Sequence, residues 1–84
     1  MNLNDKKLQW ACRRGMLELD VMLKPYLDDV YPSLDESQQA VFRRLLEQQD
    51  QNLFEWLTAR HTPEDTELAN MVKQIRSYAE HRER

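Results

Sequence analysis

The chain has 84 residues, a formal net charge of −3 and a sequence pI near 5.3. This length suits one small domain with a thin hydrophobic core, and the acidic balance argues against a domain whose main task is to coat nucleic acid or anionic lipid. One glycine and three prolines leave few residues for hairpin turns, whereas straight-chain helix formers are abundant, so the composition predicts an all-α fold.

Five helices are predicted, and together they would form one compact five-helix bundle over residues 1–84 without an internal repeat or linker. Their expected ranges are 5–14, 16–31, 35–48, 51–59 and 63–80, and residues 81–84 are expected to fray. Gly15 is the only glycine and can adopt a left-handed conformation at no steric cost, so a sharp corner is expected between the first two helices. Pro25 lies inside the second helix, where we expect a kink rather than a break because apolar periodicity continues on both sides.

Two later helices have capping signals. Asp35 followed by Gln38 is a capping pair for the third helix, although Ser33 with Glu36 has the same spacing and is an alternative. Thr62-Pro63 is expected to open the last helix, with threonine as the cap and proline in the first helical position.

The sequence offers no residue set for catalysis or metal binding. His61 lies in an expected connection and His81 in the tail, and their spacing to Cys12 matches no metal motif. A lone cysteine on an apolar helix face is typically a buried, unreactive side chain, and it suits a reducing compartment such as the cytosol. One glycine cannot build a phosphate-cradling loop, so neither a metal nor a stably bound cofactor is expected.

A compact patch of mixed charge surrounds the predicted corner at Gly15. Its charged members are Arg13, Arg14 and Glu18. Two interpretations remain open from the residues alone: an ion pair that braces two helices, which contributes about 0–1 kcal/mol when exposed, or a contact surface for another protein.

This segment resembles the bacterial SdhE/YgfY family of flavinylation factors, whose mitochondrial relatives assist the assembly of succinate dehydrogenase. The resemblance rests on an Arg-Gly-x-x-Glu signature, here Arg14-Gly15-Met16-Leu17-Glu18, within WACRRGMLELD. It continues through FRRLLEQQDQNLFEWL and a closing amphipathic helix, and so covers nearly the whole chain. The flanking residues that match are Trp10, Asp20, Asp50 and Trp56.

The resemblance implies a factor that binds the flavoprotein subunit of succinate dehydrogenase, and of the related fumarate reductase, and promotes covalent attachment of FAD. The residues implied in partner binding are Arg14, Gly15 and Glu18, with Trp10, Arg13 and Asp20 as neighbours. FAD would stay on the partner, which would perform the chemistry, so the chain would not itself be an enzyme. We expect the free chain to be a monomer. We also expect it in the bacterial cytoplasm, since no leader segment is recognisable.

Three other functions remain as alternatives. The first is an antitoxin-type protein that neutralises a small membrane-associated toxin, a role also attributed to members of this family. The second is a small nucleic-acid regulator, which the acidic charge disfavours. The third is an independent enzyme, which would need a cleft that perturbs the pKa of acidic groups.

Overall fold

The computed structural model describes residues 10, 12 and 15–82, and every regular element in that part of the chain is helical. The elements are α2 (Leu17–Asp29), the short 3-10 helix η1 (Tyr31–Ser33), α3 (Glu36–Leu46), α4 (Asp50–Leu57) and α5 (Thr66–Arg82). The prediction of a compact all-α fold is confirmed, whereas the count of five helices is not matched. The helix expected over 5–14 lies outside the described residues except at Trp10 and Cys12.

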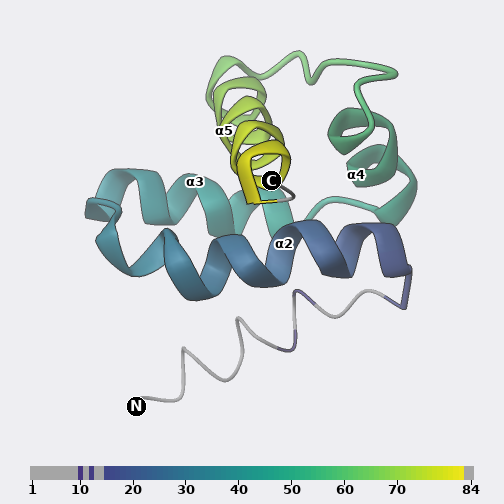
Figure 1. Ribbon diagram of the computed structural model, residues 1–84. Helices are drawn as coiled ribbons and strands as arrows, with labels where there is room; N and C mark the ends of the chain where they lie inside the picture. The colour runs from purple at the N-terminus through teal and green to yellow at the C-terminus, as the bar shows by residue number, and fades with distance from the viewer. Residues whose placement is uncertain (1–9, 11, 13–14, 83–84) are drawn as a thin grey trace.

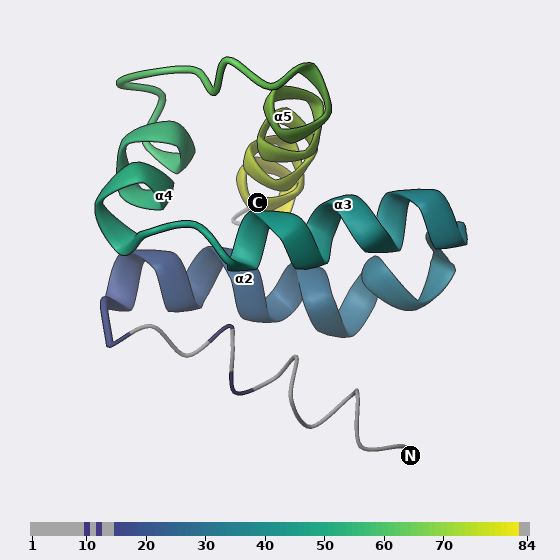
Figure 2. The ribbon, with the colours of Figure 1, turned by 180° about the vertical axis from the view of Figure 1, so that it is seen from behind.

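The helices form a small bundle with α2 at its base. In both views α2 and α3 run alongside each other, and α5 crosses them and packs against both (Figures 1 and 2). The short α4 packs against α2 and α5, close to the end of α2 at which the chain enters it (Figure 1). The Gly15 corner therefore lies at the α4 end of the molecule.

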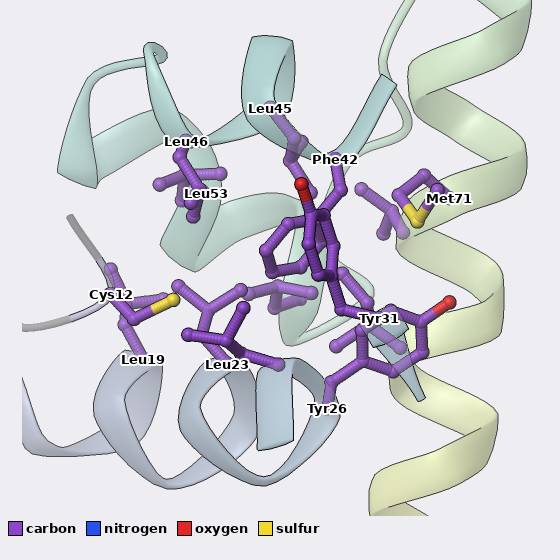
Figure 3. Packing of buried hydrophobic residues seen from close by; sticks show 14 of the residues in the cluster. Cys12, Leu19, Leu23, Tyr26, Tyr31, Phe42, Leu45, Leu46, Leu53 and Met71 are labelled. Carbon is purple, nitrogen blue, oxygen red and sulfur yellow. The ribbon is translucent and has the colours of Figure 1, made fainter. Parts of the chain in front are cut away.

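An aromatic cluster joins the elements at the centre of the core (Figure 3). The rings of Tyr26 and Phe42 stack with centroids 5.6 Å apart, and Tyr31 tilts against Phe42 at 5.3 Å. Each such pair contributes about 0.5–1.5 kcal/mol beyond its burial. Leu19 and Leu23 extend the same core toward the first turn of α2, and Cys12 lies beside Leu19 with 1% of its surface exposed (Figure 3). The prediction that the cysteine is a buried apolar side chain is confirmed.

The start of α3 agrees with its sequence signal. Asp35 has an extended backbone, and its Oδ1 accepts a hydrogen bond of 2.8 Å from the Gln38 backbone N–H. Asp35 is thus the N-cap, rather than Ser33, which belongs to η1. In α2 the helix continues through Pro25 without a break.

Other helix ends differ from the sequence prediction. The second helix ends at Asp29 instead of residue 31, because Pro32 disfavours α-helical backbone in the preceding residue and the chain turns into η1. Helix α3 ends at Leu46 and α4 begins at Asp50. The last helix extends past the predicted end at residue 80, since α5 reaches Arg82 and His81 Nδ1 lies 2.7 Å from the Ser77 carbonyl oxygen.

The predicted opening of the last helix at Thr62-Pro63 is wrong by three residues. Helix α5 begins at Thr66, and Asp65 Oδ1 accepts from the Leu68 N–H at 3.1 Å, which makes Asp65 the capping residue. Pro63 is buried, so its ring serves packing instead of starting the helix. Arg44 of α3 adds an ion pair to Asp65 with N–O distance 2.5 Å. The later of the two possible caps is therefore the one used, and it also contacts α3.

The chain leaves α4 through a Schellman motif with an alanine in the left-handed position. The Arg60 N–H donates to the Glu55 carbonyl at 2.8 Å and the Ala59 N–H to the Trp56 carbonyl at 3.2 Å. Ala59 has φ +66°, a conformation that favours glycine. The fold therefore holds a strained residue at this helix end.

Replacing that alanine by glycine is expected to stabilise the fold. Ala59→Gly relieves a left-handed strain of about 1–2 kcal/mol and loses part of that gain to the greater freedom of glycine in the unfolded chain. We expect the free energy of unfolding to rise by about 0.5–1 kcal/mol, measured by urea denaturation. The matched control is Ala40→Gly inside α3, which should lower it by about 1 kcal/mol. A change in the free energy of unfolding with the same sign in both variants would contradict the left-handed conformation of Ala59.

Asp65 makes the start of α5 sensitive to acid. The hydrogen bond from Leu68 N–H, together with the Arg44 guanidinium, holds the pKa of this carboxyl below its usual value. A lowered pKa in the folded state stabilises the fold above the unfolded pKa of about 3.9, and the contribution is lost as the pH falls through the folded value.

Asp65→Asn keeps a capping side chain but removes the titrating group. At neutral pH the variant should unfold at lower denaturant concentration than the parent, and this difference should shrink below about pH 4. Denaturation midpoints between pH 2 and 7 measure this. Arg44→Gln keeps the Asp65 cap and removes the ion pairs of Arg44 with Asp65 and with Glu67, so its midpoint should still fall as Asp65 is protonated, by less than that of the parent. A difference that stays constant with pH would show that the charge plays no part.

Candidate functional site

Gly15 forms the corner at which the chain enters α2. Its φ of +78° confirms the predicted left-handed conformation. The next residue, Met16, is extended, and its carbonyl accepts the first helical hydrogen bonds from the N–H groups of Leu19 and Asp20 at 3.0 and 3.1 Å. The helix thus begins immediately after the corner.

The space around Gly15 is open. A Cβ atom built on this residue would meet no heavy atom within 4 Å. A Cβ atom here would therefore cost about 1–2 kcal/mol of backbone strain but would meet no steric clash. Ala59 shows that the fold accommodates an alanine in the same conformation. The open space also allows another protein to approach the backbone closely.

Glu18 lies in the first turn of α2 with its side chain exposed. It makes no hydrogen bond or ion pair with the residues that the structure describes. Met16 gives α2 no side-chain cap, so the negative charge of Glu18 stands near the positive end of the helix dipole. The alternative of a bracing ion pair involves Arg13 and Arg14, which lie outside the described residues. The carboxylate of Glu18 is accessible to a partner.

The remaining residues implied in partner binding are placed differently from one another. Trp10 exposes 72% of its surface, a large fraction for an indole side chain. Asp20 is half-buried on α2. The structure therefore presents Trp10, Gly15 and Glu18 to solvent, with Asp20 partly covered.

Sequence reasoning missed two exposed apolar residues of α2. Leu17 and Val21 expose 72% and 57% of their surfaces. The available signal was their position, since both fall outside the apolar stripe that contains Leu19 and Leu23, on the face where an amphipathic helix is normally polar. Together with Trp10 they are the exposed large hydrophobic residues of the described chain.

Elsewhere the polar groups serve the fold. A groove between the C-terminal halves of α2 and α5 contains the Tyr26 hydroxyl, which donates to Gln74 Oε1 at 3.2 Å, and the Tyr78 hydroxyl, which donates to Asp29. Burial raises the pKa of Tyr26. These contacts tie α2 to α5.

Two kinds of feature are absent from the described residues. They contain no cluster of three histidine, cysteine or carboxylate side chains that could hold a metal ion. They also contain no helix with the length and apolar character needed to cross a bilayer.

The chain is similar to known proteins along most of its length. Residues 6–79 match the family Sdh5, flavinator of succinate dehydrogenase. The FAD assembly factor SdhE of Pseudomonas aeruginosa is 54% identical over 70 residues, which are 83% of each chain. The protein of the same name from Shewanella oneidensis is 47% identical over 77 residues, 92% of this chain and 94% of that protein. The solution structure of a UPF0350 protein matches with a TM-score of 0.77 and 40% identity, covering 98% of this chain and 88% of that one.

Proposed function

The chain belongs to the Sdh5 family of succinate dehydrogenase flavinators, and we propose that it binds the flavoprotein subunit of that enzyme and promotes covalent attachment of FAD. The family match over residues 6–79 is the observation that carries the proposal. The surface at Gly15 and Glu18 supports it, because both positions of the Arg-Gly-x-x-Glu signature that the structure describes are exposed. A partner could contact them without any rearrangement of the domain.

The factor acts by binding instead of by supplying a reactive group. A protein that binds one conformation of the flavoprotein shifts its population toward that conformation. If a histidine of the flavoprotein and the flavin methyl carbon are held within about 3–3.5 Å, positioning alone removes a large part of the barrier. In this proposal the partner holds FAD and performs the bond formation, and the chain is not an enzyme.

The proposal extends to the setting of the reaction. The free factor is a monomer in the bacterial cytoplasm, where it meets the flavoprotein of succinate dehydrogenase and also that of fumarate reductase. The antitoxin alternative gains no support from the relatives, which are named as FAD assembly factors.

The direct test measures covalent flavin on the partner. The flavoprotein subunit is produced in cells with and without this chain, and its in-gel flavin fluorescence is compared after denaturing electrophoresis. We expect a clear increase when the chain is present. The proposed function would be refuted if the flavoprotein shows equal fluorescence in the two strains although the chain is present and folded in the one that produces it.

Two substitutions test the surface. Glu18→Ala and Gly15→Arg should each reduce flavin attachment, because the first removes an exposed charge and the second fills the open space at the corner. Far-UV circular dichroism should stay close to the parent for both. Gly15→Arg should lose about 1–2 kcal/mol of stability from backbone strain.

Each substitution has a matched control. Glu36 is an exposed glutamate in the first turn of α3, so Glu36→Ala removes the same charge at an equivalent helix position and should leave flavin attachment unchanged. Gly15→Ala carries the same backbone strain as Gly15→Arg without the long side chain, and should retain more activity. If both Gly15 variants lose activity equally, strain explains the effect and blocked docking does not.

A further inference from the structure

We propose that Leu17 and Val21 form an apolar ridge on the outer face of α2 that packs against an apolar surface of the flavoprotein subunit. In this arrangement Glu18 lies at the edge of the ridge, facing a basic side chain of that subunit. The inference rests on the proposed function and specifies its contact surface. We refer to Leu17 and Val21 together as the α2 ridge.

The α2 ridge lies opposite the core. Successive residues of an α-helix are 100° apart, so Leu17 and Val21 each lie roughly 160° around the axis from Leu19. Leu19 is fully buried, whereas the two ridge residues expose 72% and 57% of their surfaces. The core therefore gives no reason for apolar side chains at these two positions.

The same face becomes polar one turn further along the helix. Lys24 and Asp28 follow on this side of α2 and form an ion pair with Nζ and Oδ2 2.6 Å apart. This pair is what a solvated helix face normally carries. The apolar character is thus confined to the first two turns of α2, which begin at the Gly15 corner.

The ridge is continuous with the surface already assigned to the partner. Val21 follows Leu17 by four residues and Glu18 by three, so its side chain neighbours both of them on the helix surface. Leu17 lies between Gly15 and Glu18 in the sequence and is exposed like both of them, so a protein that binds at the corner reaches the ridge within one helical turn. The large exposed hydrophobic residues of the described chain all fall between residues 10 and 21, on either side of Gly15.

The composition of this surface favours a protein partner that dissociates. A small apolar centre bordered by charge resembles the interfaces of non-obligate complexes. The exposed carboxylate of Glu18 at the edge disfavours an anionic lipid surface and favours a partner with a basic group at that point.

The test compares binding of purified apo-flavoprotein subunit to matched variants by titration calorimetry. Leu17→Gln/Val21→Gln should weaken binding roughly tenfold to a hundredfold, because burial of these two side chains is lost. Lys24→Gln/Asp28→Gln changes the same helix face one turn away, and its affinity should stay within about threefold of the parent. Circular dichroism and thermal unfolding should match the parent for both, since all four side chains lie outside the core.

Salt separates the two parts of the contact. At 0.5 M sodium chloride the loss caused by Leu17→Gln/Val21→Gln should persist, whereas the loss caused by Glu18→Gln should shrink, because salt screens exposed charges. A ridge effect that disappears with salt would contradict an apolar contact.

The outcomes distinguish this inference from the function on which it rests. If the parent binds and supports flavin attachment but the Leu17→Gln/Val21→Gln variant does so equally well, the ridge is wrong and the proposed function stands. If the parent forms a dimer in sedimentation equilibrium that this variant abolishes, with flavoprotein affinity unchanged, the ridge joins two copies and the inference is overturned. If the parent neither binds the flavoprotein nor raises its flavin content, the proposed function fails and the inference fails with it.

Discussion

The packing of one face of α2 into the core is the constraint on which the site depends. Leu19 and Leu23 are fully buried, and each contributes about 1.5–3 kcal/mol by burial. Tyr26 continues that face and stacks on Phe42 of α3. Once these side chains face inward, the helix has no rotational freedom left. Every residue on the opposite side is then displayed to solvent in a fixed arrangement, with no loop or hinge required to position it.

The two left-handed residues of the described chain show why the glycine matters. Ala59 adopts this conformation at the end of α4, where the hydrogen bonds of the Schellman motif offset its backbone strain. Gly15 has the same backbone region but open space around it. Its small size is therefore not needed to avoid a clash within the domain. Two reasons for a glycine at this position are left: it avoids backbone strain, and it lets a partner approach the backbone. Only the second reason is particular to Gly15, because its corner lies beside Glu18.

Local signals were sufficient for several parts of the fold. The left-handed corner at Gly15 and the cap at Asp35 follow from residue types and short spacing, and the structure confirms both. The start of α5 did not follow, because Thr62 and Asp65 are both acceptable caps by residue type, and the burial of Pro63 and the ion pair from Arg44 to Asp65, which accompany the later start, involve tertiary packing. Ala59 gave no signal, since alanine is not a residue that favours left-handed backbone.

Some residues of the candidate site could likewise be identified from the sequence, and others required the structure. The exposed positions of Gly15 and Glu18 agree with the surface that the sequence resemblance implied, but that resemblance drew attention to the charged residues. Leu17 and Val21 could not be identified from the sequence because they lie outside the apolar stripe of α2, and leucine and valine on the other face fit no motif. Their meaning depends on exposure, which only the packing of the whole domain determines.

The small size of the α2 ridge suits a factor that must dissociate from the flavoprotein once FAD is attached. Related complexes differ mostly in their rates of dissociation, and a large apolar interface would hold the flavoprotein after FAD is attached. In the proposed contact, a ridge of two aliphatic side chains with one exposed charge at its edge would bury only a small apolar area. It also remains small beside the roughly 800 Å² per partner of a stable specific interface. The ion pair of Lys24 and Asp28 would confine the proposed apolar contact to the first turns of α2, and a contact of that size would allow the complex to dissociate.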